Sequence, residues 1–252
     1  MNTEERRAKI EELIRERREL DVNFIRETFG VSSVTVRNDL MYLERRGVIR
    51  RLFGKAVLRD DRIAGAFDPD MVENLEYKER IGRFAASLIG DNDSVMLCNG
   101  TTVMQVARNI DESKSIIAVT NSIYIAHEVR RCRNIKPVLI GGNLSPETGA
   151  AYGVQAIKQL EQYNIDKLFI SVDGIDARGG ITNNYPNEND INFAVIRASK
   201  RVIVVADHTK IGKVHFAQIG EIGSVNVLVT DYRAPQDKLE QIKKKGVTVY
   251  QV

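Results

Sequence analysis

Seven short apolar runs recur along residues 76–252, and segments with a helical pattern stand between most of them. This alternation is typical of a largely parallel β-sheet that helices cover on both faces. We therefore expect an α/β fold for this part of the chain. The predicted strands are residues 94–97, 116–119, 137–140, 167–172, 202–206, 225–229 and 247–250, and the predicted helices are residues 76–89, 102–109, 122–131, 153–163, 187–199 and 235–245.

The first 58 residues have a different pattern, that of a small helical module. Three stretches place apolar residues at helical spacing, and Gly30 and Ser32 supply a C-cap and an N-cap between the second and the third. Residues 48–58 read as two short strands around a turn at Gly54. Three helices followed by a basic hairpin predict a winged helix-turn-helix. The apolar residues that define the helices are Ile10, Leu13 and Ile14, then Ile25 and Phe29, then Val36, Leu40 and Leu43.

Positive charge is concentrated in this module. Residues 1–62 contain 15 Lys and Arg against 12 Asp and Glu, whereas residues 63–252 contain 22 of each, so the whole net charge of +3 lies in the first quarter of the chain. A local basic patch on a neutral body indicates contact with a polyanion, although a solvated helix face would give the same pattern.

The predicted third helix presents a polar face opposite its apolar stripe, and such a face suits the reading of base edges in the major groove. Arg37 either reads a base or pairs with a surface carboxylate such as Glu44. Asn38 contacts a base or a phosphate, and Asp39 is expected to orient a neighbouring arginine. The hydroxyl residues alternatively do no more than cap the helix. The predicted DNA contacts are Ser32, Ser33, Thr35, Arg37, Asn38 and Met41 from the helix and Arg50, Arg51 and Lys55 from the wing.

The helix carries the pattern Val31-Ser32-x-x-Thr35-Val36-Arg37-x-Asp39-Leu40, and the wing carries Gly47-x-Ile49-x-Arg51-x-x-Gly54. With these patterns, residues 6–58 resemble the DeoR family of bacterial sugar-metabolism repressors, which implies DNA binding. The family usually has a second arginine where this chain has Asn38 and a second glycine where it has Lys55. Because asparagine can pair with adenine through two hydrogen bonds, Asn38 predicts an altered operator preference.

Residues 59–75 contain Gly65 and Pro69 and lack sustained periodicity, which indicates a linker. The chain of 252 residues is longer than the roughly 100–200 typical of one domain. We therefore predict a winged helix-turn-helix DNA-binding domain over residues 1–58, a linker over 59–75, and a domain for effector binding and oligomerisation over 76–252.

Polar residues follow the predicted strands, at the edge where sheets of this type bind ligands. The Gly-Thr-Thr turn at residues 100–102 offers backbone N–H groups and a helix dipole to a phosphate, although it is alternatively only a tight strand-to-helix connection. Lys210 adds a positive charge, and Asp173 or Asp207 can accept hydrogen bonds from sugar hydroxyls. Neither G-x-G-x-x-G nor G-x-x-x-x-G-K-[ST] occurs, so a small phosphorylated ligand fits better than a nucleotide. The predicted effector residues are Asn99, Gly100, Thr101, Thr102, Asn121, Ser122, Gly141, Gly142, Asp173, Glu188, Asp207 and Lys210.

Several strand-end segments match those of the DeoR effector domain: Gly100-Thr101-Thr102, Thr120-Asn121-Ser122, Asp173-Gly174-Ile175-Asp176 and Asp207-His208-Thr209-Lys210. With them, residues 76–252 resemble that domain, which implies a fold similar to ribose-5-phosphate isomerase and a phosphorylated sugar or related metabolite as inducer. Relatives often carry an acidic residue where this chain has Cys98, so the polarity near the sugar is an open point.

The same likeness supplies an alternative, a sugar-phosphate isomerase with a fused DNA-binding module. Its carboxylate base would come from residues such as Glu188, with Lys210 to polarise the carbonyl. The lysine next to a triple glycine in that enzyme is replaced here by Arg178-Gly179-Gly180, and arginine is a poor proton donor at neutral pH.

We favour a cytoplasmic transcriptional repressor that binds double-stranded operator DNA as a homodimer or tetramer and is released by a phosphorylated sugar. No catalytic residue, metal ligand, cofactor or membrane segment is predicted. The N-terminus has no apolar core of a signal peptide, and two cysteines give no disulfide framework.

Overall fold

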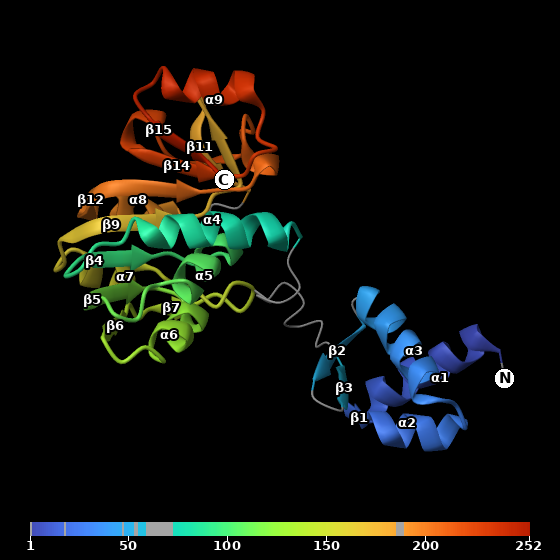
Figure 1. Cartoon of the computed structure of the whole chain (residues 1–252). Helices are drawn as coiled ribbons and strands as arrows, with labels where there is room; N and C mark the ends of the chain where they lie inside the picture. The colour runs from blue at the N-terminus through green and yellow to red at the C-terminus, as the bar shows by residue number, and fades with distance from the viewer. Residues whose placement is uncertain (1, 18, 47, 53–54, 59–72, 185–188) are drawn as a thin grey trace. The chain divides into compact units, whose positions relative to one another are not determined.

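The computed structural model of the chain describes residues 2–17, 19–46, 48–52, 55–58, 73–184 and 189–252. The chain divides into two compact units, residues 1–65 and 66–252 (Figure 1). Each unit has hydrophobic core residues of its own. Among the described helices, none is long and apolar enough to cross a membrane.

The N-terminal unit is a winged helix-turn-helix, as predicted. A short strand that the sequence pattern did not indicate joins the wing hairpin, so that the sheet is antiparallel with the order β1-β3-β2. This strand contributes Leu20 to the core between exposed neighbours. The elements are α1 (Thr3–Arg17), β1 (Glu19–Asp21), α2 (Val22–Phe29), α3 (Ser33–Arg45), β2 (Ile49–Leu52) and β3 (Lys55–Leu58).

Both predicted caps between α2 and α3 are confirmed. Gly30 has a φ of 60° and its N–H donates to the carbonyl of Arg26, which ends α2 in the left-handed conformation that glycine adopts easily. The Ser32 hydroxyl accepts a hydrogen bond from the Thr35 N–H at 3.1 Å and so begins α3. The two caps fix the turn, and Val36, Leu40 and Leu43 of α3 then pack into the core.

In the C-terminal unit, all seven predicted apolar runs form strands of one parallel sheet, with the order β15-β14-β12-β9-β4-β5-β6 (Figure 1). The inner strands are mostly buried on both faces, which explains their continuous apolar pattern, whereas the edge strands β6 and β15 are largely exposed. The strands are β4 (Ser94–Leu97), β5 (Ile116–Thr120), β6 (Ile135–Leu139), β9 (Ile165–Ile170), β12 (Ser199–Val205), β14 (Val227–Thr230) and β15 (Thr248–Gln251).

The helices form a layer on each face of this sheet. Val95 and Leu97 of β4 pack in one core together with α4, α5 and α6, whereas Met96 points to the opposite core, which contains α7, α8 and α9. The six predicted helices are therefore confirmed. Their bounds are α4 (Leu75–Ser87), α5 (Thr101–Arg108), α6 (Ile123–Val129), α7 (Val154–Leu160), α8 (Asn189–Ala198) and α9 (Gln236–Lys243).

Shorter strands that the sequence analysis did not expect lie outside the parallel sheet. One group forms a small antiparallel sheet with the order β10-β11-β13, and the other is the hairpin of β7 and β8. They are β7 (Asn143–Leu144), β8 (Ala151–Tyr152), β10 (Gly174–Asp176), β11 (Gly180–Asn183) and β13 (Ala217–Gly220), and the 3₁₀ turns are η2 (His208–Lys210) and η3 (Ile222–Ser224).

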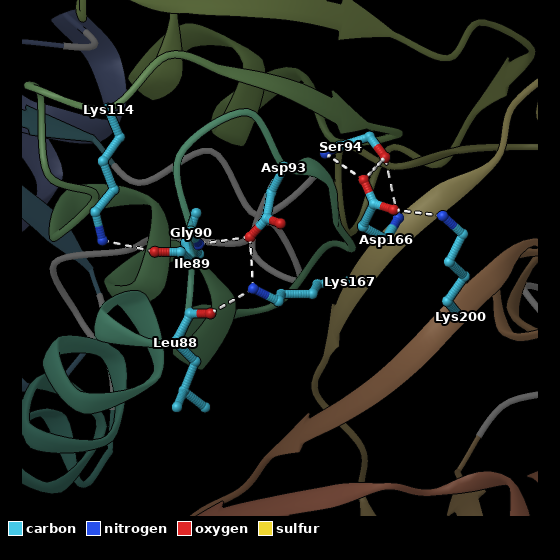
Figure 2. A network of polar contacts seen from close by, with 9 residues as sticks. All are labelled: Leu88, Ile89, Gly90, Asp93, Ser94, Lys114, Asp166, Lys167 and Lys200. Atoms are coloured by element: carbon cyan, nitrogen blue, oxygen red, sulfur yellow. Dashed lines mark hydrogen bonds and ion pairs between the residues drawn. The ribbon is translucent and has the colours of Figure 1, made fainter.

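Charged side chains join the amino ends of the central strands (Figure 2). Lys167 donates to Asp93 at 2.6 Å, and the Asp166 carboxylate accepts from Ser94 at 2.7 Å and from Lys200 at 2.8 Å. The hydrogen bonds from Lys200 and Ser94 hold the pKa of Asp166 well below its ordinary value. This network fixes β4, β9 and β12 at the end of the sheet away from the predicted ligand edge.

The strand order reverses between β4 and β9. From β4 the chain proceeds outward through β5 to β6, and it then returns to β9 on the other side of β4 and proceeds to β12, β14 and β15. At such a switch point the flanking connections leave in opposite directions, and a crevice forms at the carboxyl ends of the two strands. The topology therefore points to residues that follow β4 and β9 as the centre of a ligand site.

Candidate DNA-binding and effector sites

The structure places the predicted base-reading residues on one face of α3. Ser33, Arg37 and Asn38 are exposed and Met41 is half-buried, on the side of the helix away from its core stripe. The Ser32 hydroxyl is occupied as the N-cap and also lies 2.9 Å from the Thr35 hydroxyl. The capping interpretation therefore accounts for Ser32 without DNA.

Asp39 of α3 is buried and holds two arginines of α1. Arg6 Nε lies 2.6 Å from one carboxylate oxygen and Arg7 Nε lies 2.8 Å from the other. The sequence predicts an arginine partner for Asp39, but the partners come from another helix, more than 30 residues away. The carboxylate therefore fixes α3 against α1, while Arg37 and Asn38 next to it stay on the exposed face.

In the wing, β2 pairs with β3 so that Arg51 lies opposite Ala56. The side chains of Arg50 and Arg51 and the turn residue Gly54 lie outside the described part of the chain. The ammonium of Lys55 lies 2.7 Å from the Glu19 carboxylate, and this hydrogen bond raises the pKa of Lys55. Both side chains are about half exposed, so this pair is open to exchange with a phosphate.

The carboxyl ends of β4 and β9 touch at the switch point. Gly100 has a φ of +136°, and a Cβ on it would overlap the Ser171 hydroxyl, so any other residue there would be strained and would have to displace that side chain. The same hydroxyl donates to the Asn99 carbonyl at 3.2 Å. Asn99, Gly100 and Thr101 are half-buried and Thr102 is buried, so the start of α5 lies at this edge with its free N–H groups.

Next to it, Asn121 follows β5 and is buried. Its amide nitrogen donates to the Ala151 carbonyl at 3.1 Å, and the Ala151 N–H donates to the Asn121 backbone carbonyl at 2.7 Å. Ser122 caps α6 through the Ile125 N–H. These contacts hold the β7–β8 hairpin at the sheet edge. In the described part of the structure, the Asn121 Oδ1 atom is buried without a hydrogen-bond partner.

The two glycines after β6 have structural explanations. Gly141 exchanges backbone hydrogen bonds with the Gln159 side chain of α7, at 3.1 and 3.2 Å. A Cβ on Gly142 would come within 2.5 Å of the Tyr152 carbonyl oxygen. Close backbone approach therefore explains the glycine at 142, whereas a Cβ on Gly141 would make only ordinary contacts with Gln159, at 3.7 and 4.0 Å. Both residues lie at the outer end of the predicted ligand edge.

Two aspartates follow β9 and β12, which are adjacent strands. Asp173 accepts a hydrogen bond from the Asn184 N–H at 2.9 Å, and its other oxygen lies 3.7 Å from Lys210 Nζ. Asp207 is buried and accepts from the Thr209 N–H at 2.9 Å. Glu188, the remaining carboxylate in the predicted set, lies outside the described residues.

Lys78 of α4 joins this group, although the sequence analysis did not select it. Its Nζ lies 3.8 Å from Asp207 Oδ2 and its side chain is 11% exposed. Burial lowers the pKa of Lys78, with the Asp207 charge opposing that shift and the nearby Lys210 adding to it. The sequence did contain a sign of this burial. Lys78 stands three residues before Ile81 and so falls on the buried face of the predicted helix.

The first turn of α4 rests on the loops that follow β12 and β14. The Tyr77 ring meets His208 edge-on at 5.3 Å and Tyr232 at 5.8 Å, and Arg233 donates to the Tyr77 hydroxyl at 3.2 Å. The carboxylate of Asp231, fully buried, accepts from the His208 N–H at 2.7 Å and ties the two loops together. Tyr77 and Asp231 were not predicted, since only the strand order brings them together.

Comparison with known proteins agrees with this two-unit organisation. Residues 6–62 match the model of the DeoR-like helix-turn-helix domain, and residues 73–232 match the model of the DeoR C-terminal sensor domain. The two matches together span most of the chain.

Curated relatives match along nearly the full length. The transcriptional regulator GlpR of Haloferax volcanii is 33% identical over 97% of this chain and 96% of its own. The transcriptional repressor GlcR of Bacillus subtilis is 32% identical over 98% of this chain and 95% of its own. The transcriptional repressor AccR of Agrobacterium fabrum is 33% identical over 91% of this chain and 90% of its own. These names describe regulators, so they do not support the isomerase alternative.

Solved structures show weaker likeness. The sorbitol operon regulator SorC of Klebsiella pneumoniae gives a TM-score of 0.45 with 13% identity over 96% of this chain and 99% of that chain. Ribose 5-phosphate isomerase A of Methanocaldococcus jannaschii gives a TM-score of 0.42 with 15% identity over 55% of each chain. Both TM-scores are too low to add support. The two domain matches and the full-length relatives show that this chain belongs to the DeoR family and is a DNA-binding transcriptional regulator, not an enzyme.

Proposed function

We propose that the protein represses a carbohydrate-metabolism operon and leaves its operator when a phosphorylated sugar binds at the carboxyl edge of the parallel sheet. The observation that carries this proposal is the switch point between β4 and β9, where the start of α5 and a pair of lysines converge on one edge. Family membership supports the repressor role, since the resemblance implies sugar operons as targets.

For DNA binding, the exposed face of α3 enters the major groove. Arg37, Asn38 and Met41 reach base edges there, and the wing residues Arg50 and Arg51 contact the phosphate backbone. One winged helix covers a single half-site, so a homodimer or tetramer is needed for useful specificity.

For effector binding, the ligand phosphate lies at the start of α5, where residues 100–102 offer backbone N–H groups and the positive end of a helix dipole. Lys210 and Lys78 supply two positive charges whose ion pairs with Asp173 and Asp207 are longer than hydrogen bonds. An anion that takes these ammonium groups frees the two carboxylates to accept hydrogen bonds from sugar hydroxyls.

The response reaches the DNA-binding unit through the first turn of α4. This turn directly follows in sequence the residues that join the two units, and it rests on the strand-end loops through Tyr77 and Lys78. A ligand that binds Lys78 changes its pairing with Asp207 and so changes the packing beneath this turn. Release requires that the ligand bind more tightly to the arrangement that does not bind DNA. A ligand with equal affinity for both arrangements would leave their populations unchanged.

A two-part assay tests the proposal. Thermal shift with a panel of aldose and ketose phosphates, and with the parent sugars, identifies ligands, and fluorescence anisotropy on labelled operator measures release. We expect a sugar phosphate to stabilise the protein and release DNA without being converted. Thr101→Ala and Lys210→Ala should bind operator normally and fail to release it, whereas Lys78→Gln should retain part of the thermal shift and lose release.

Lys136→Ala serves as the matched control, because Lys136 is an exposed lysine at the amino end of β6, the end of the sheet away from this edge. It should release operator like the wild type. Stabilisation by none of the phosphates, or equal release by the unphosphorylated sugars, would contradict the proposed effector class. Loss of operator binding in folded Thr101→Ala protein would contradict the division of roles between the two units.

A further inference from the structure

Two arginines flank one tyrosine on the surface where α1 meets α3. The Arg7 guanidinium carbon lies 4.1 Å from the centre of the Tyr42 ring, and that of Arg46 lies 5.8 Å from the same centre. We call Arg7, Tyr42 and Arg46 the arginine–tyrosine band. None of the three belongs to the predicted set of DNA contacts, and Tyr42 is an exposed large aromatic residue in a small domain.

The band carries more positive charge than its carboxylate partners neutralise. Asp39 is shared between Arg6 and Arg7, at 2.6 and 2.8 Å, and so offers one negative charge to two guanidinium groups. The same arrangement occurs one turn further along α1, where Glu11 lies 2.8 Å from Arg15 and 3.6 Å from Arg46.

Counted together, these four arginines and two carboxylates leave a net charge of +2 along the α1–α3 contact. Each carboxylate can neutralise only one of the two guanidinium groups that it holds. Such a surface attracts an anion that can accept from two guanidinium groups at once.

Arg7, one of the two arginines of the band, is held in place by its neighbours. Arg7 is held at Nε by a buried carboxylate and across its plane by the Tyr42 ring, and its side chain is 24% exposed. Its terminal nitrogen atoms make no hydrogen bond among those described. A guanidinium fixed in this way gives up little conformational freedom when it binds phosphate oxygens.

The band lies beside the proposed base-reading face. Tyr42 stands four residues after Asn38, so the two side chains occupy successive turns on the same side of α3. A helix that enters the major groove has a sugar–phosphate backbone along each side, and side chains on its flank reach that backbone.

We propose that Arg7 and Arg46, both next to the Tyr42 ring, bind a phosphodiester of the DNA backbone next to the bases that α3 reads. The guanidinium groups donate to the phosphate oxygens and the Tyr42 hydroxyl adds a third donor. This contact positions α3 in the groove and acts on all sequences alike. The proposal rests on the placement of α3 described under the proposed function.

The test measures the affinity of the full chain for operator duplex and for random duplex as a function of salt. Loss of one phosphate contact lowers the salt slope by about 0.9, which corresponds to an affinity about eightfold weaker at 0.1 M salt. The double variant Arg7→Gln/Arg46→Gln removes the contact and should show this loss on both duplexes, with an unchanged ratio between them. Each single variant should show part of it. Arg46 is 55% exposed, so its variant keeps the fold even if the Arg7 variant disturbs Asp39.

Arg26→Gln is the matched control, because Arg26 is an exposed arginine of α2 whose partner is Glu27. It removes the same charge at a site outside the band and should change the salt slope little. If Arg46→Gln behaves like Arg26→Gln, the band does not contact phosphate and the inference is wrong.

Arg37→Ala separates this inference from the placement of α3. If it lowers the operator-to-random ratio while the band variants leave the salt slope unchanged, only the band is refuted. If Arg37→Ala leaves the ratio unchanged, the placement of α3 fails, and the band proposal fails with it.

Discussion

Replacing Asp39 with asparagine should strongly destabilise the DNA-binding unit while leaving the effector unit intact. The amide side chain introduced by Asp39→Asn would retain one oxygen that can accept from either Arg6 or Arg7, but its nitrogen is a donor and faces the other guanidinium. One buried charge-assisted hydrogen bond is then lost, and a guanidinium group remains beside a second donor. The two side chains have almost the same volume, so the change in stability reports the loss of the charge and not a change in packing.

The magnitude follows from burial. Asp39 is 1% exposed and its partners are 11% and 24% exposed, so the pair belongs to the buried class, in which removal of one charge costs about 3–5 kcal/mol. The partial exposure of Arg7 favours the lower end, about 3 kcal/mol. A unit of this size has a total stability of about 3–5 kcal/mol. The variant therefore retains about 0–2 kcal/mol, and a measurable fraction is unfolded at 25 °C.

The assay follows the two units separately in the full-length chain. Limited proteolysis and hydrogen exchange should show faster opening of residues 1–58 in the variant, with exchange of the parallel sheet unchanged, and operator binding should weaken in proportion. Glu27→Gln is the control, since its ion pair with Arg26 is exposed and contributes less than about 1 kcal/mol. Wild-type protease resistance in Asp39→Asn would refute the reasoning.

Two further substitutions test the effector unit. Gly100→Ala should destabilise this unit by about 2–4 kcal/mol, from steric overlap with Ser171 and a strained positive φ, and should abolish the effector response. In a Ser171→Ala background, the free energy of unfolding measured by urea titration should recover only the part lost to steric overlap. Full recovery would show that the positive φ is not strained. Asp166→Asn should flatten the acid dependence of stability. The pKa of Asp166 is lowered in the folded state. Its contribution to the free energy of unfolding is therefore fully present above about pH 4 and is lost as the pH falls below that value. Urea midpoints for this variant that fall as steeply as those of the wild type between pH 5 and 3 would contradict this.

Continuous apolar runs made the parallel sheet predictable. Residues such as 202–206 are buried on both faces, so their pattern needs no partner strand to be recognised. Gly30 and Ser32 were predictable as caps because the cause is local. The strands β10, β11 and β13 were missed, because they are short and each contains a glycine.

The candidate sites were predictable to a different extent. Strand-end residues such as Gly100 and Asp207 follow directly from the strand pattern. Lys78 was missed although its spacing from Ile81 places it on the buried face of the helix, because a lysine in a helical pattern is ordinarily a surface residue. Its partner Asp207 stands more than 120 residues further along the chain. The partners of Asp39 were likewise hidden, since they are set by how α1 packs against α3.

The central pair of the sheet, β4 and β9, joins residues that stand 72 positions apart in the chain. During synthesis this pair cannot form until residues 165–170 have left the ribosome, whereas every strand pairing of the winged helix lies within the first 58 residues. A nascent chain can therefore complete its DNA-binding end well before its sensing end exists. Ribosomes that stop early would leave single winged helices that reach only one half-site and cannot respond to any metabolite.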